Sequence, residues 1–137
     1  MKPVATALCL SALILPLTGA AAARDDLLAT YAATTKATTP SFSGFSATRG
    51  AKLHVTRSTG GKPETPSCTT CHSDSPRGAG RTPAGKAIEA VAVSVTPTRY
   101  TDPVKVEKWF KRNCTEVLGR ECTSLEKGDW LSYMISQ

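Results

Sequence analysis

Aromatic residues, histidines and methionines are all scarce in this chain. Three phenylalanines, three tyrosines and two tryptophans make up 6% of its 137 residues, which is little material for an apolar core. Two histidines and five cysteines do not form a structural zinc site, because no second C-x-x-C or H-x-x-x-H pair is present. Beyond the N-terminus, no apolar run is long enough to span a membrane. These shortages exclude a zinc ribbon and predict a mature protein without a membrane-spanning segment.

The N-terminus carries the one long apolar segment of the sequence. A positively charged start is followed by an apolar run over Val4–Leu17 and then by four alanines. This order is typical of a secretory signal peptide. We expect residues 1–23 to be cleaved in the periplasm. Residues 24–137, which number 137 − 23 = 114, are then enough for a single domain.

The centre of the sequence reads Cys-Thr-Thr-Cys-His at residues 68–72, the C-x-x-C-H pattern of covalent haem attachment. Each thiol forms a thioether with a haem vinyl group, and the histidine becomes the proximal axial ligand of the iron. A thioredoxin-like dithiol would lie at a strand-to-helix junction, whereas glycines and prolines precede this motif. We therefore expect one haem c on Cys68, Cys71 and His72, with a backbone carbonyl from residues 79–83 accepting the second ring N–H.

Two more cysteines, Cys114 and Cys122, remain in the mature chain and are free to pair in an oxidising compartment. Without Lys2 the mature chain has 17 − 1 = 16 basic and 11 acidic residues, a formal charge of +5 before haem is added. The basic residues are scattered and do not alternate with aromatic ones, which argues against nucleic-acid binding. A basic face favours docking to an acidic redox partner, although a merely solvated surface explains the charge equally well.

Helical periodicity and helix-start signals predict an all-α domain, in which an enclosed haem supplies much of the apolar core. Asp102 followed by Pro103, and Thr123 followed by Glu126, are strong start signals. The segment 86–93 is expected to be a helical turn followed by an extended loop. The expected helices are 25–37, 47–56, 101 to 113 or 115, and 123–135, with a helical turn at the haem motif.

The sequence offers three candidates for the second axial ligand, of which two are weak. Met134 is the one methionine of the mature chain, but it falls near the end of the last helix, where Met134 and Ile135 are both expected to face the core. Filling the core explains it better than ligation does. His54 is the only other histidine, and its neighbours Lys52 and Arg57 indicate a solvent-exposed face of its helix.

Asn113 is the third candidate. It follows Val106, Trp109 and Phe110 at the spacing i, i+3, i+4, i+7, so it falls on the apolar stripe of its helix. A buried amide needs a polar partner or a metal ion. The alternative is that Asn113 simply caps the C-terminus of this helix, as asparagine often does.

Two stretches of the chain closely resemble the sphaeroides haem protein family. The first is Thr59–His72, and the second is Val106–Cys114 together with residues 119–123. The resemblance implies a small class I cytochrome c-like helical fold with one haem c and an asparagine as distal ligand. Ser73 stands where we expect glycine, which concerns only the local turn. The implied site comprises haem attachment at Cys68 and Cys71, axial ligation by His72 and Asn113, and a disulfide between Cys114 and Cys122.

An amide oxygen is a weak, hard donor that ferric iron tolerates better than ferrous iron. Reduction is therefore expected to release Asn113, so that the ferrous haem binds dioxygen, nitric oxide or carbon monoxide. The resemblance implies a dihaem cytochrome c as redox partner and an electron-transfer role, with a part in an oxidase or reductase acting on such a gas. The alternative is a plain electron carrier with His72 and Met134 as ligands. Peroxidase catalysis would need a distal base or arginine, which the sequence does not place.

Overall fold

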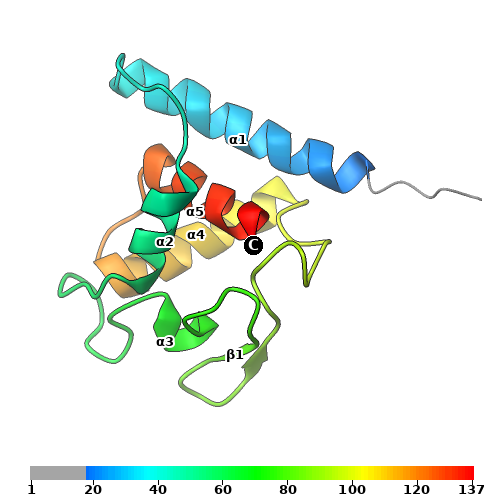
Figure 1. The fold of residues 1–137 in the computed structure, drawn as a ribbon. Coiled ribbons are helices and arrows are strands. Elements are labelled where there is room, and N and C mark those ends of the chain that lie inside the picture. Colours follow the sequence, from blue (N-terminus) through cyan, green and yellow to red (C-terminus); the bar gives the residue numbers. More distant parts are fainter. Residues whose placement is uncertain (1–17) are drawn as a thin grey trace, which may run out of the picture.

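The computed structural model describes residues 18–137, and Figure 1 shows them as a small helical domain. This confirms the predicted all-α class, because the only strands among these residues form a two-residue ladder, with Gly80 opposite Ile88. The predicted signal segment lies mostly outside the described residues. The elements in chain order are α1 (Thr18–Thr38), α2 (Ala47–Val55), α3 (Thr69–His72), β1 (Gly80–Arg81), β2 (Ala87–Ile88), α4 (Pro103–Leu118) and α5 (Ser124–Ser136).

The caps confirm three of the predicted helix starts, whereas α1 begins at Thr18 and not at residue 25 as expected. Ser46 caps α2 by accepting a hydrogen bond from the backbone of Arg49. Asp102 caps α4 in the same way, with proline at the first helical position. Thr123 and Glu126 form the predicted capping box of α5. These side chains satisfy the first N–H groups of each helix and so determine where each helix begins.

The helix α5 lies at the centre of the domain and packs against both α1 and α2 (Figure 1). The core formed by these elements and α4 contains Leu27, Tyr31, Val106 and Leu131. Three aromatic rings continue this core in edge-on contacts, with Phe110 at 5.6 Å and Tyr100 at 5.9 Å from Trp130. Because so few aromatic residues are present, most of them are concentrated in this one region.

Two predicted core positions are wrong. Trp109 is 45% exposed, and the guanidinium of Arg112 lies over its ring at 5.5 Å. The buried stripe of α4 instead follows Val106, Cys114 and Val117. Ile135 is also exposed, since it lies beside the buried Met134 on the last turn of α5. Both residues lie at the edge of the apolar stripe of their helix, where a step of one residue turns the side chain by about 100° around the helix axis and can move it from the core to solvent.

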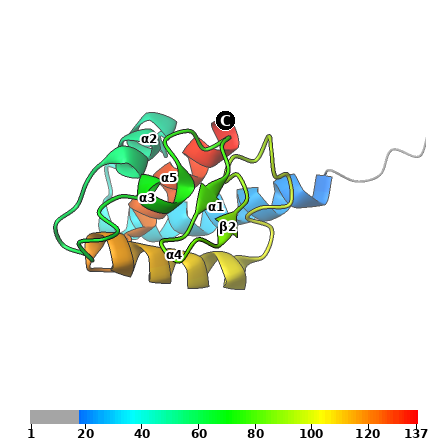
Figure 2. The same ribbon diagram turned by 90° about the horizontal axis from the view of Figure 1, so that it is seen from below.

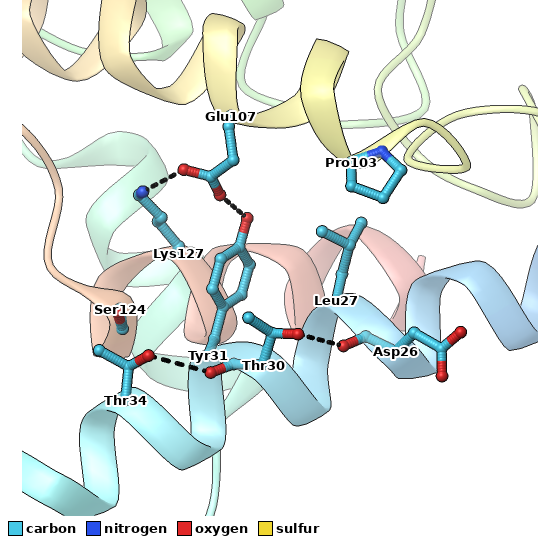
Figure 3. A pocket seen from close by; sticks show the side chains of 9 residues that line it. All are labelled: Asp26, Leu27, Thr30, Tyr31, Thr34, Pro103, Glu107, Ser124 and Lys127. Atoms are coloured by element: carbon cyan, nitrogen blue, oxygen red, sulfur yellow. Dashed lines mark hydrogen bonds and ion pairs between the residues drawn. The ribbon is translucent and has the colours of Figure 1, made fainter.

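The helices α1, α4 and α5 are joined by a polar network (Figure 3). The hydroxyl of Tyr31 donates to Glu107, and the ammonium of Lys127 pairs with the other oxygen of the same carboxylate at 2.6 Å. Burial and the nearby carboxylate raise the pKa of Tyr31, so its hydroxyl remains a donor. A cavity of about 300 Å³ lies beside this network, and no residue of the haem motif lines it.

The helices α2 and α5 cross at very close range. A Cβ added to Gly50 would lie 2.1 Å from the backbone oxygen of Asp129, so only glycine fits. The carboxylate of Asp129 is almost fully buried and accepts from the guanidinium of Arg49 and from the backbone of Ser46. This pairing fixes the start of α2 against α5.

The segment 86–93 does not contain the expected helical turn at its start. Residues 87–88 form β2, and turns follow it to Tyr100. Three backbone groups in this region are held by side chains, since Arg99 donates to the carbonyls of Glu89 and Ala90, and Tyr100 donates to that of Val91. These bonds replace those of a helix and allow Val91 and Ala92 to be buried in an irregular segment.

Within residues 18–137, no helix is both long and apolar enough to cross a lipid bilayer.

Candidate haem site

The haem motif folds as one short helical turn. The amides of Cys71 and His72 both donate to the carbonyl of Cys68, at 3.2 and 3.0 Å. The hydroxyls of Ser67 and Thr69 bond each other at 2.7 Å just before this turn. Residues three and four apart lie on the same face of a helical turn, so the turn places both thiols and the imidazole on one side.

The two thiols of the motif are free, although Cys114 and Cys122 are joined by a disulfide. Burial raises the pKa of Cys68 to about 11, so this sulfur is a neutral thiol at pH 7. Burial and the nearby carboxylate of Glu116 also raise the pKa of Cys71. Thioether formation with haem requires two free thiols, and Cys68 and Cys71 provide them. No group of three or more His, Cys, Asp or Glu side chains placed to hold a metal ion occurs among residues 18–137.

His72 is partly buried and neutral. Burial lowers its pKa to about 4, and the positive charge of Arg99 contributes to the same shift. Its Nδ1 atom has no hydrogen-bond partner in the described part of the chain, so the carbonyl acceptor expected from residues 79–83 is not in place. A neutral imidazole that has no protein partner can bind a metal ion through one of its ring nitrogens. The residues of this motif therefore fit a haem iron.

The backbone of the motif is closely enclosed by β1. A Cβ added to Gly80 would lie 2.0 Å from the backbone oxygen of Cys71 and 3.0 Å from the Cα of His72. Only a residue without a side chain allows β1 to approach the motif this closely. The helix α3 lies beside this strand pair in both views (Figure 1 and Figure 2).

The loop that leads into the motif is fixed to the C-terminal end of α4. The carbonyl of Glu116 accepts from the backbone of Lys62 at 2.7 Å and from the hydroxyl of Thr65 at 3.3 Å. A Cβ added to Gly61 would collide with the same carbonyl at 2.2 Å. The last turns of α4, which carry Asn113, are thereby held in a fixed position relative to the haem motif.

Asn113 lies inside α4 and does not cap it. The helix continues to Leu118 and ends at Gly119, whose φ of 71° is the usual left-handed C-cap. The predicted end at residue 113 or 115 and the capping alternative are therefore both wrong. Asn113 is partly buried next to the buried Cys114, and its amide makes no side-chain hydrogen bond within the described residues.

Comparison with known proteins identifies the family. Residues 40–134 match a family described as a domain of unknown function, DUF1924. The chain is 52% identical to cytochrome c-type protein SHP of Cereibacter sphaeroides over 91 residues, which cover 66% of this chain and 70% of that protein. The chain belongs to the sphaeroides haem protein family. Accordingly it is a class I-like helical cytochrome c with one covalently bound haem c.

Solved structures of relatives share the fold. A structure described as oxidised SHP, an oxygen-binding cytochrome c, superimposes with a TM-score of 0.77 at 45% identity, covering 83% of this chain and 96% of that chain. Oxidised cytochrome c'' from Methylophilus methylotrophus superimposes with a TM-score of 0.73 at 26% identity, covering 89% and 97%. A solution structure of cytochrome c'' from the same organism, whose description refers to haem-ligand detachment, gives 0.72 at 26%, covering 83% and 93%.

Within this member of the family, His54 differs most from what the sequence indicated. The predicted solvent-exposed face is wrong, because His54 is 0% exposed. Its Nδ1 lies 3.3 Å from the indole nitrogen of Trp130, and its Nε2 lies 3.0 Å from the carbonyl oxygen of Ser73. Both ring nitrogens are therefore engaged, and His54 is not available as an axial ligand. The charged neighbours of His54 in sequence gave no signal of this burial.

Proposed function

We propose that this protein is an exported haem protein in which His72 and Asn113 bind the ferric iron and Asn113 leaves on reduction. The haem supplies the iron that carries the electron and, once reduced, takes a diatomic gas. Cys68 and Cys71 hold the porphyrin through thioethers. The single observation that carries this proposal is the position of Asn113, an unpaired amide in the middle of α4.

An amide in the middle of a helix usually faces solvent or finds a hydrogen-bond partner. Asn113 does neither completely, since it is partly buried and its amide bonds no side chain or backbone group in the described residues. The carboxylate of Glu116, three residues after Asn113 on α4, lies close enough to Cys71 to raise the pKa of its thiol. We therefore infer that the amide of Asn113 is available as an oxygen ligand of the haem iron.

The release of Asn113 follows from the weakness of its bond to iron. A neutral amide oxygen is a hard donor, and the added electron makes the iron softer and less attractive to it. The disulfide at the next residue, Cys114, anchors the backbone while leaving the side chain free to rotate. Relatives described as oxygen-binding and as undergoing haem-ligand detachment are consistent with this sequence of events.

The alternative ligand, Met134, is less well supported. Its side chain is 0% exposed and lies one turn after the fully buried Leu131 on α5. Its backbone carbonyl also accepts from the amide of Val93, which keeps this turn in place. Such a position fits a side chain that fills the core between α5 and the segment around Val91.

We also propose that residues 1–23 are removed as a signal peptide and that residues 24–137 form the periplasmic domain. In the structure α1 runs through the proposed cleavage point, and Arg24 donates to the carbonyls of Pro97 and Arg99. Cleavage after residue 23 would leave this bond in the mature protein. A dihaem cytochrome c or a membrane cytochrome with an acidic face is the proposed redox partner of the basic domain.

Two matched variants test the ligand assignment. Asn113→Ala should convert the ferric protein from six-coordinate to a form with an open or water-filled position, visible in its absorption and electron paramagnetic resonance spectra. Met134→Leu keeps the volume of the core and should leave both spectra unchanged. If Met134→Leu changes the ferric spectrum and Asn113→Ala does not, the protein is a His/Met electron carrier and the proposal is wrong.

A further inference from the structure

His54 is a buried histidine that the proposed ligand set does not use. It lies on α2, which packs against α5, and it has no exposed surface. Burial lowers its pKa, so the ring is neutral. A neutral imidazole has one donor and one acceptor nitrogen, and the partners decide which is which.

The partners of His54 determine its tautomer. The indole nitrogen of Trp130 can only donate, so Nδ1 of His54 must be the acceptor at 3.3 Å. Nε2 then carries the proton and donates it to the carbonyl of Ser73 at 3.0 Å. Both partners are satisfied only in this one tautomer, which the geometry therefore assigns.

Ser73 directly follows His72, and its backbone is strained. Its φ of 60° and ψ of 165° lie in a region that glycine adopts easily and serine does not. Serine stands here where the sequence resemblance led us to expect glycine. A strained conformation persists only if its surroundings hold it, and the carbonyl of Ser73 is the group that His54 holds.

Trp130 in turn is fixed by the aromatic core. Its ring makes edge-on contacts with Phe110 on α4 at 5.6 Å and with Tyr100 at 5.9 Å. A continuous series of ring contacts and hydrogen bonds therefore runs from the aromatic core through Trp130 and His54 to Ser73.

We propose that His54 is the positioning residue of the proximal ligand, and that its Nε2–H bond to Ser73 sets the orientation of His72 beneath the iron. This inference rests on His72 being that ligand, as proposed above. A well-placed imidazole donates more strongly to iron and stabilises the ferric state. Loss of the His54 bond lets the segment after His72 relax and weakens this donation.

Two variants of His54 test the proposal. His54→Leu removes both hydrogen bonds. The reduction potential should rise as the ferric–ferrous equilibrium shifts by up to about tenfold, which is about 59 mV for one electron. The iron–histidine stretching band in the resonance Raman spectrum of the ferrous protein should move to lower frequency. His54→Gln keeps an acceptor and a donor at similar spacing and should return both readings toward wild type.

Asp129→Asn is the matched control. It weakens the ion pair with Arg49 at the same α2–α5 contact and lowers stability, but it leaves the bonds of His54 intact. Its potential and Raman band should stay at wild-type values. The proposal is overturned if His54→Leu leaves both readings unchanged, if His54→Gln shifts them as much as His54→Leu, or if Asp129→Asn shifts them equally.

A measurement on the wild-type protein covers the case in which His54→Leu fails to fold. Nitrogen-15 NMR of the low-spin ferrous protein, with carbon monoxide added where needed, reports the tautomer of His54. A proton on Nε2 and none on Nδ1 supports the proposal, and any other state overturns it. This result does not depend on the iron ligands, whereas a wild-type ferrous protein that is five-coordinate but shows no iron–histidine band would overturn the assignment of His72 itself.

Discussion

Removal of the disulfide between Cys114 and Cys122 should destabilise the domain by an amount that the loop size sets. The two cysteines are eight residues apart. A loop of this size loses about 8 cal/mol/K of closure entropy, or about 2.5 kcal/mol at 25 °C. With an unfolding entropy of about 2.1 cal/mol/K per residue over about 114 residues, the melting temperature should fall by about 10 °C.

The assay is thermal unfolding followed by circular dichroism, on the double variant Cys114→Ser/Cys122→Ser and on wild type. Wild type treated with a thiol reductant is the matched control, because the thioethers to haem are not reduced and only the disulfide opens. Both samples should melt about 10 °C below untreated wild type. Equal melting temperatures in all three samples would refute the reasoning that this disulfide stabilises the domain by restricting the unfolded chain.

The same variant should also loosen Asn113, whose backbone is continuous with Cys114. The ferric double variant should bind an external ligand such as imidazole a few-fold more tightly than wild type, since the distal amide competes less well. An unchanged imidazole affinity would contradict the view that the disulfide steadies the distal ligand.

Two further substitutions have clear expected outcomes. Gly80→Ala places a Cβ 2.0 Å from the backbone oxygen of Cys71, so it should lower the stability of the domain by about 1–3 kcal/mol and reduce the haem content, measured as pyridine haemochrome. The control Gly85→Ala, where a Cβ meets no atom within 4 Å, should load haem normally. Equal haem content in both variants would contradict this prediction. The hydrogen bond from Arg120 is the main cause that lowers the pKa of Glu126 below 4.5. The stabilisation from this ion pair is present above pH 4.5 and is lost as the pH falls through the lowered pKa of Glu126. In a plot of melting temperature against pH, Glu126→Gln should therefore fall less steeply on the acid side than wild type. Parallel plots for variant and wild type would exclude the effect.

Local signals in the sequence correctly predicted the starts of α2, α4 and α5. Asp102 before proline and Thr123 before Glu126 act through hydrogen bonds within one turn, so residues near in sequence decide them. The haem motif was equally clear, because its chemistry needs a fixed spacing. The helical class and the family followed from these short stretches.

Contacts between distant residues could not be predicted in this way. His54 is buried because Trp130 and Ser73 take both of its ring nitrogens, and neither lies near it in sequence. The end of α4 was placed too early, because Gly119 stops the helix only where it meets the loop at Gly60. The segment 86–93 is irregular because Arg99 and its neighbours bind its carbonyls.

The central claim is that Asn113 leaves the iron when the protein is reduced, and carbon monoxide titration of the ferrous wild-type protein tests it most directly. The account predicts a high-spin, five-coordinate ferrous spectrum that changes completely and rapidly on addition of carbon monoxide. A low-spin ferrous spectrum that carbon monoxide does not alter would contradict it, because a strong sixth ligand such as Met134 would then remain on the reduced iron.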